Sequence, residues 1–340
     1  MAHREAHTRA ATGPLGRRDS GRWPRSIHPT TARLSRAKLD GSFPDASQYG
    51  RGMVLSTVLT TRLGPVEVVY LPGDKPPVLF FPGGHCSAAS DCGWRLYQDS
   101  GHGLLAFSRP GYGRTMVGRL NAGEFVPAVI DCCHLLGVRR TTAVVGVSFG
   151  GLQAIEVAVQ HPHLAPRLLL HSCAPSTRPY PDTPSERLGG PVLFSPALQR
   201  LTWRTVTRLV ASDAGLRRMV APLSDRPIQQ WWHTWSDDDR RRAREMFRTM
   251  DSGRGFGYDL QQGRPDRATH RHLLQRQVPC PTLVTASRQD AGVAFTHAQD
   301  LAATIPAAAL VELTCPSHLF WIGPERSQAQ AAIDDFLAST

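Results

Sequence analysis

Short apolar runs alternate with helical patterns along most of this chain. Eight runs have the length and composition of strands: 53–61, 65–71, 77–81, 104–107, 143–147, 167–171, 282–286 and 309–313. The first two are close enough to form a hairpin around 62–64. Most later runs are separated by helical patterns, which implies crossover connections between parallel strands. The pattern therefore predicts a mostly parallel eight-stranded sheet with helices on both faces.

Three helices have recognisable ends. Residues 121–136 begin with Asn-Ala-Gly-Glu, where Asn121 is the predicted N-cap and Glu124 reaches back to complete a capping box. A second helix follows Ser148 and ends near His161, because Pro162 cannot continue it. The last helix spans about 325–337.

The alternation breaks after the sixth strand, between about 175 and 262. This stretch is rich in aromatic residues and helical patterns and has no strand pattern, so we expect a helical cap folded over the strand ends. Trp231, Trp232 and Trp235 are its candidate substrate-pocket residues, and a small core inside the cap is the alternative. The predicted division is a tail (1–50), a core in two parts (51–174 and 263–340) and the cap (175–262).

The first 50 residues are polar, with nine basic against four acidic side chains and four prolines. Such a segment buries too little apolar surface to offset its ordering entropy, so we expect it to be disordered. Whether translation starts at Met1 or Met53 stays open. The whole chain of 340 residues carries a formal net charge of +11, almost all of its basic residues being arginine. No nucleic-acid-binding motif accompanies that charge.

The seven cysteines have no framework spacing and no C-x-x-C pair. This favours buried thiols in a reducing compartment. No run approaches the roughly 18 apolar residues of a membrane span, and the N-terminus lacks a signal-peptide apolar region. We therefore expect a cytoplasmic protein whose partner is a small molecule, with no nucleic-acid or membrane partner. Its oligomeric state stays open.

The candidate chemistry centres on Ser148, which lies between Gly146 and Gly150 where the strand 143–147 meets a helix. The pattern G-x-S-x-G alone arises by chance in roughly one chain in ten of this length. Its position at a strand–turn–helix junction is what favours a nucleophile elbow, in which the serine hydroxyl stands clear of the sheet.

A base and an orienting carboxylate follow in the order Ser, Asp, His. Asp290 lies on the loop after the strand 282–286, and His318 lies on the loop after 309–313. The carboxyl ends of parallel strands meet at one sheet edge, so Ser148, Asp290 and His318 are predicted to converge. The other candidates have packing or surface interpretations: Asp300 inside a helical pattern, His134, His161 and His171.

An oxyanion hole is also required, and the loop after the third strand reads Pro-Gly-Gly-His-Cys-Ser-Ala. We predict the N–H of Gly84 as one donor and the N–H of Phe149, the residue after the nucleophile, as the other. A simple tight turn is the alternative interpretation of the glycines.

From Met53 to Thr340 the chain resembles the α/β-hydrolase superfamily, in its capped branch with a serine nucleophile. The matching segments are FFPGGHCSA, SRPGYGRT, GVSFGG, SRQDAGV and PSHLFWIGPE. The resemblance implies hydrolysis of an ester-like bond through an acyl-enzyme, with no metal and no organic cofactor. Serine at the elbow disfavours the dehalogenase and epoxide hydrolase branches. Pro82 stands where the family often has histidine, which leaves the bracing of the oxyanion loop open.

Several activities share such a triad. Amidase, thioesterase, lactonase, carbon–carbon bond hydrolase and cofactor-free perhydrolase chemistry are all compatible with it, because cap side chains set the substrate. A small and largely apolar ester is our expectation. A non-catalytic small-molecule binding module of the same fold is the alternative from another class.

Overall fold

The computed structural model describes residues 55–182, 194 and 198–339, all within the compact unit Ala46–Thr340. The predicted tail, 1–50, lies outside the described residues, as do 183–193 and 195–197 of the predicted cap.

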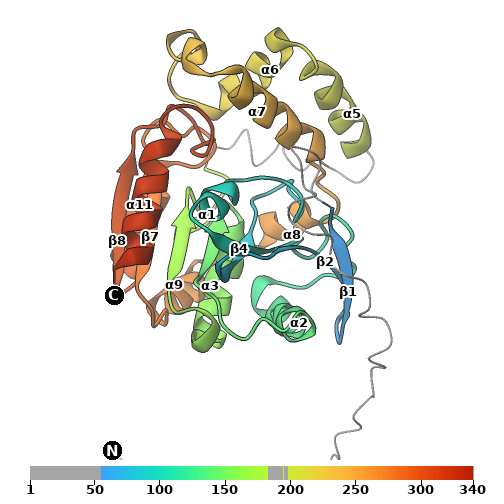
Figure 1. The fold of residues 1–340 in the computed structure, drawn as a ribbon, viewed down its shortest axis with the longest axis vertical. Helices are drawn as coiled ribbons and strands as arrows, with labels where there is room; N and C mark the ends of the chain where they lie inside the picture. The colour runs from blue at the N-terminus through green and yellow to red at the C-terminus, as the bar shows by residue number, and fades with distance from the viewer. Residues whose placement is uncertain (1–54, 183–193, 195–197, 340) are drawn as a thin grey trace, which may run out of the picture. The chain divides into compact units, whose positions relative to one another are not determined.

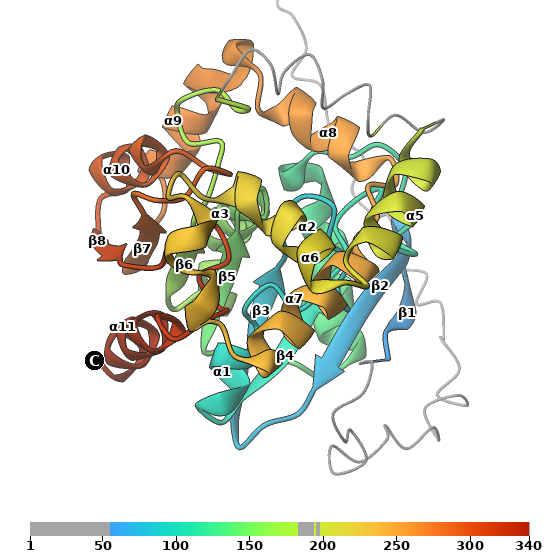
Figure 2. The same ribbon diagram turned by 90° about the horizontal axis from the view of Figure 1, so that it is seen from above.

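Eight strands form one sheet in the order β1-β2-β4-β3-β5-β6-β7-β8 (Figures 1 and 2). Their bounds are β1 Thr57–Thr61, β2 Gly64–Leu71, β3 Lys75–Phe81, β4 His102–Phe107, β5 Ala143–Val147, β6 Leu168–His171, β7 Thr282–Ser287 and β8 Ala308–Leu313. β1 and β2 form the antiparallel hairpin, β2 also pairs antiparallel with β4, and the remaining pairs are parallel. The predicted sheet is confirmed.

Two apolar clusters cover the two faces of this sheet. Alternate residues of β3 divide between them: Phe80 faces one cluster and Phe81 the other, as the two-residue period of a strand requires. The first cluster includes α1 (Arg95–Asp99) and α11 (Arg326–Ala338); the second includes α2 (Ala122–Leu135), α3 (Gly150–Gln160), α9 (Ala268–Arg276) and α10 (Phe295–Thr304).

The predicted capping box at the start of α2 is confirmed. The Glu124 N–H donates to Asn121 Oδ1 at 3.0 Å, and the Asn121 N–H donates to Glu124 Oε2 at 2.9 Å. Each side chain thus satisfies a backbone donor that the first helical turn leaves free, which fixes where the helix begins.

Helices also fill the connection between β6 and β7. They are α5 (Gln199–Leu209), α6 (Asp213–Val220), α7 (Asp237–Thr249) and α8 (Gly255–Gln262), followed by α9. Figure 1 shows α5, α6 and α7 together on one side of the sheet. We refer to residues 198–262 as the insertion.

Backbone hydrogen bonds tie the insertion to four loops that follow strands. His318 N–H donates to the Leu223 carbonyl at 2.9 Å, and Asp251 N–H donates to the His85 carbonyl at 2.8 Å. Further along, Asp225 bonds to Gln289 and Gly255 to Gly111. The insertion therefore contacts the loops after β3, β4, β7 and β8, at the carboxyl edge of the sheet.

All seven cysteines are free and buried, as expected from their spacing. In the described ranges no helix has both the length and the apolar character needed to cross a membrane.

Candidate active site

Ser148 occupies a strained turn between β5 and α3. Its φ of 52° lies in the left-handed region, and its N–H donates to the His171 carbonyl at 3.0 Å. A Cβ on Gly146 would lie 2.6 Å from the Gly151 Cα, and one on Gly150 would lie 2.0 Å from the Phe81 carbonyl oxygen. Only glycine fits at either position, which explains the G-x-S-x-G pattern physically.

Asp290 and His318 lie on the loops after β7 and β8 and are hydrogen-bonded to each other. His318 Nδ1 is 2.7 Å from Asp290 Oδ2. The second carboxylate oxygen, Oδ1, accepts the N–H groups of Gly292 at 2.8 Å and Val293 at 2.9 Å. The Asp290 side chain is fully buried, and the two N–H contacts to Oδ1 hold the other oxygen, Oδ2, toward the imidazole.

The imidazole of His318 is held through Nδ1, which leaves Nε2 as the ring nitrogen that does not face Asp290. Its Nδ1 faces Asp290, and its backbone is anchored to Leu223. Burial opposes a charge on the ring, but the Asp290 carboxylate and its hydrogen bond outweigh burial, so the pKa of His318 is raised. Among the described residues no hydrogen bond joins Ser148 Oγ to His318. Catalytic contacts of this kind are often long until substrate binds.

The predicted oxyanion loop packs directly against the elbow. A Cβ on Gly83 would lie 3.0 Å from Ser148 Cβ, and one on Gly84 would lie 3.1 Å from the Phe149 ring. Within the described part of the chain, the N–H groups of Gly84 and Phe149 donate to no protein acceptor. Unpaired donors beside a strained serine could receive a developing negative oxygen.

The sequence of this chain matches the model of the alpha/beta hydrolase family over residues 78–332. The chain belongs to this family. A curated relative, "Uncharacterized hydrolase YcgS" of Bacillus subtilis (strain 168), is 29% identical over 273 residues, which cover 78% of this chain and 93% of the relative.

Two solved structures share the fold at low identity. An alpha/beta hydrolase fold protein from Nakamurella multipartita superposes with a TM-score of 0.64 and 22% identity, covering 83% of this chain and 99% of that one. A thermophilic esterase from Thermogutta terrifontis gives a TM-score of 0.58 and 20% identity, covering 83% of this chain and 98% of that one.

Arg109 braces the predicted oxyanion loop of this alpha/beta hydrolase, a contact that the sequence did not reveal. Its Nε donates to the Pro82 carbonyl at 3.0 Å and its NH2 group to the Gly83 carbonyl at 3.0 Å. The same guanidinium pairs with Asp259 of α8 at 2.5 and 2.8 Å. The bracing left open by Pro82 is therefore supplied by an arginine of the SRPGYGRT segment.

Aromatic rings from the insertion and from nearby segments of the core gather beside the predicted oxyanion loop. The His85 ring lies 4.1 Å from Phe256 and 5.3 Å from Trp203, centroid to centroid, and Phe149 lies 5.0 Å from Tyr180. His85 Nδ1 is also 2.8 Å from Ser252 Oγ. Burial, together with the nearby Arg109 charge, lowers the pKa of His85 to about 3, so this ring is uncharged at neutral pH.

The three tryptophans of the WWHTW segment lie elsewhere in the insertion. Trp231 and Trp235 are each 2% exposed, and their rings lie 5.5 Å apart within the first apolar cluster. Trp232 is partly exposed, with the Arg240 guanidinium 5.5 Å from its ring centre. Burial of the first two favours the core alternative for them.

A second set of Ser, His and Asp side chains is hydrogen-bonded together, with the Asp182 side chain 28% exposed. Ser176 Oγ lies 2.9 Å from His297 Nδ1, and His297 Nε2 lies 2.9 Å from Asp182 Oδ1. Ser176 and His297 are both 0% exposed, and Ser176 N–H also points at His297 Nδ1. These contacts fasten the chain after β6 to α10. Asp300, the other aspartate considered for the triad, also joins α10 to the chain after β6, because it accepts hydrogen bonds from the N–H and hydroxyl of Thr177.

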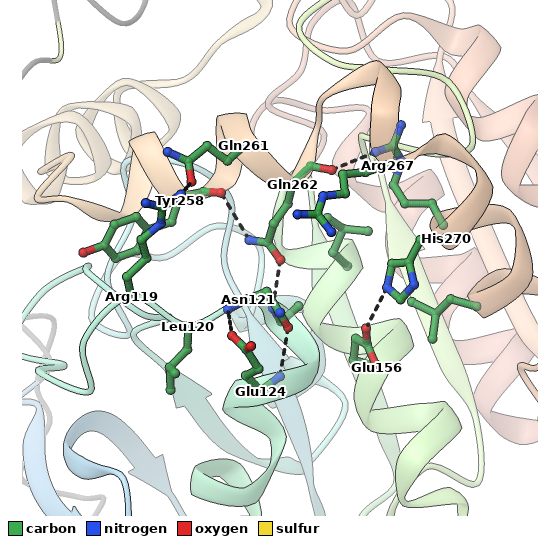
Figure 3. Close-up of a pocket in the computed structure, with 14 residues that line it drawn as sticks. Arg119, Leu120, Asn121, Glu124, Glu156, Tyr258, Gln261, Gln262, Arg267 and His270 are labelled. Atoms are coloured by element: carbon green, nitrogen blue, oxygen red, sulfur yellow. Dashed lines mark hydrogen bonds and ion pairs between the residues drawn. The ribbon is translucent and has the colours of Figure 1, made fainter.

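A cavity of about 190 Å³ is lined by residues of α2, α3, α8 and α9, and none of the three proposed triad residues lines it (Figure 3). Tyr258 and Gln262 of α8 line it, and they also line a smaller cavity that reaches Arg109 and Phe149. No group of three His, Cys, Asp or Glu side chains in the described ranges is arranged to hold a metal ion.

Proposed function

We propose that this protein is a serine hydrolase that cleaves an ester-like bond of a small, largely apolar substrate through an acyl-enzyme. The observation that carries the proposal is the hydrogen bond between Asp290 and His318, which lie on the loops after β7 and β8. Ser148, in its strained turn, follows β5 of the same sheet. Family membership and the curated relative support a hydrolytic reaction.

In the first half-reaction, Ser148 Oγ attacks the acyl carbon while His318 Nε2 takes the hydroxyl proton. The carbonyl oxygen becomes an oxyanion and accepts the N–H groups of Gly84 and Phe149. The bond to the leaving group then breaks, and His318 gives its proton to that group.

In the second half-reaction, water attacks the acyl-enzyme and passes a proton to His318. The tetrahedral intermediate collapses, the acid leaves, and the proton returns to Ser148 Oγ. Throughout, Asp290 keeps the Nδ1 proton in place and stabilises the imidazolium. No metal or organic cofactor takes part in this proposed cycle.

We propose that the insertion is a cap that shapes the substrate pocket. Its apolar character near the oxyanion loop, where Trp203 and Phe256 surround His85, suits an apolar acyl or leaving group. Trp231, Trp232 and Trp235 belong to this proposed cap, and the burial of Trp231 and Trp235 favours a role in its core for those two. The esterase from Thermogutta terrifontis shares this fold, and its ester chemistry is compatible with the proposal.

Labelling with a fluorophosphonate tests the proposal. We expect the wild-type protein to gain one adduct on Ser148 and the Ser148→Ala variant to gain none. A series of aryl esters of increasing acyl length should then show turnover with a distinct optimum. A protein that is not labelled but still binds apolar esters would favour the non-catalytic binding module.

Perhydrolase and carbon–carbon bond hydrolase activities are the alternatives on the same triad. Both would retain fluorophosphonate labelling but would give little turnover of any aryl ester. Peroxyacid formation from a carboxylic acid and hydrogen peroxide, or cleavage of a β-diketone, would then identify the reaction.

A further inference from the structure

Arg109 is almost completely enclosed, at 4% exposure, yet it carries a full charge. Burial alone would lower its pKa, but the Asp259 carboxylate outweighs burial, so the pKa of Arg109 is raised. Enclosed ion pairs are weak sources of stability, because desolvation offsets most of the attraction. The contacts of this pair therefore call for another explanation.

Those contacts fall on two consecutive peptide groups of the oxyanion loop. Arg109 Nε holds the Pro82 carbonyl, and Arg109 NH2 holds the Gly83 carbonyl, each at 3.0 Å. A trans peptide is planar, with its carbonyl and N–H pointing in opposite directions. Anchoring the Gly83 carbonyl therefore aims the Gly84 N–H away from Arg109.

The first of these peptide groups is held through the Pro82 carbonyl, which Arg109 Nε contacts. The second has its Gly83 carbonyl held by the same guanidinium, while its N–H, that of Gly84, has no acceptor in the described part of the protein. Arg109 thus fixes the direction of the Gly84 N–H, which remains available to a ligand.

Asp259 and Tyr112 hold the guanidinium in place. Asp259 accepts two hydrogen bonds from Arg109, and the Tyr112 hydroxyl donates to Asp259 Oδ2 at 2.6 Å. The Arg109 guanidinium also lies 4.9 Å from the centre of the Tyr112 ring. Because Asp259 belongs to α8, the orientation of the loop depends on how the insertion packs.

We propose that Arg109 is a positioning residue that aims the Gly84 N–H at the oxyanion, with Asp259 of α8 fixing Arg109. This inference rests on the proposed serine-hydrolase function. It predicts that the Arg109–Asp259 pair affects transition-state stabilisation and leaves ground-state binding nearly unchanged.

The experiment compares inhibition by an aryl-alkyl trifluoromethyl ketone, which adds to the serine as an oxyanion, with inhibition by the corresponding methyl ketone. In Arg109→Gln and Asp259→Asn we expect affinity for the trifluoromethyl ketone and kcat to fall together by about 10²-fold, the cost of displacing a catalytic group by about 1 Å. Affinity for the methyl ketone and KM should change less than about 3-fold. Arg109→Lys should resemble Arg109→Gln, since one ammonium cannot replace the two-pronged contact.

Arg271→Gln is the matched control. Arg271 is also enclosed, at 2% exposure, and holds the carbonyls of Ser176 and Gln262, but it does not contact the oxyanion loop. Its replacement should lower the melting temperature and leave the ratio of the two ketone affinities unchanged. A similar fall of that ratio in Arg271→Gln would overturn the assignment to Arg109.

Fluorophosphonate labelling distinguishes a failure of the proposed serine-hydrolase function from a failure of the positioning role of Arg109. An unlabelled wild-type protein would overturn the proposed function and the role of Arg109 with it. A labelled wild type whose Arg109 and Asp259 variants keep full kcat and full trifluoromethyl ketone affinity would overturn only the positioning role. If Arg109→Gln does not fold, Asp259→Asn and the milder Tyr112→Phe decide between the same two outcomes.

Discussion

At the scale of single residues, the proposed chemistry depends on one directed contact, from His318 Nδ1 to Asp290 Oδ2 at 2.7 Å. Two backbone N–H groups occupy Asp290 Oδ1, so the carboxylate cannot rotate without losing them. The imidazole consequently presents Nε2 in a fixed direction, as a general base must.

We expect Ser148→Ala, His318→Ala and Asp290→Asn each to lower kcat by roughly 10³- to 10⁶-fold. Double variants should be scarcely worse than single ones, because the residues act as one unit. Steady-state kinetics on the best aryl ester measure this. Asp300→Asn is the control, since that carboxylate bonds to Thr177 instead, and full turnover by Ser148→Ala would end the serine-hydrolase proposal.

The raised pKa of His318 sets the direction of the pH dependence. Only the neutral ring accepts a proton, so kcat/KM should fall as pH drops through a value above the ordinary 6.5 of this residue. In Asp290→Asn the carboxylate is gone and burial remains, so the inflection of the residual activity should move to lower pH. A pH–rate profile with the same inflection in both proteins would contradict this electrostatic coupling.

At the scale of elements, the sequence predicted the features that neighbouring residues determine, such as strand ends and helix caps. The strand at 143–147 has the predicted ends, and the capping box at Asn121 forms as its sequence indicates. Asp290 and His318 could be proposed as acid and base from the sequence because each follows the end of a predicted strand, and the structure joins them by a hydrogen bond. The Arg109–Asp259 pair joins residues 150 positions apart, and no periodicity or spacing signals such a contact. The rings around His85 also come from residues far apart in the sequence, so the sequence did not predict that they would meet.

The two aromatic groups of the insertion should respond differently to truncation. Trp235 is enclosed in the first apolar cluster, so Trp235→Ala should lower the free energy of unfolding by about 3–5 kcal/mol without altering substrate preference in the folded fraction. Phe256 lies against His85 and Phe149, so Phe256→Ala should shift the preferred acyl length. Denaturant titration and the aryl ester series measure the two effects. Unchanged acyl preference in Phe256→Ala would place the pocket elsewhere in the insertion.

At the scale of the whole molecule, the described residues form one sheet whose two faces are covered by separate apolar clusters. The insertion joins this unit through loops after β3, β4, β7 and β8. It contacts the proposed triad through the Leu223 carbonyl and the predicted oxyanion loop through Asp259 of α8 and Arg109.

The sheet and the proposed site use residues from Thr57 onward, which leads to a prediction about the N-terminal segment. A protein that begins at Met53 keeps β1 and its pairing from Thr57 to Thr61 with β2, as well as the Arg62–Asp131 ion pair. We expect its melting temperature to stay within about 2 °C of the full chain, a shift corresponding to about 1 kcal/mol, and its kcat to be unchanged. A protein beginning at Gly64 is the control: it lacks β1, exposes the edge of β2, and should lose stability and solubility. Thermal unfolding and ester turnover of the three proteins decide, and an insoluble or inactive protein beginning at Met53 would show that the N-terminal segment contributes to the fold or the site.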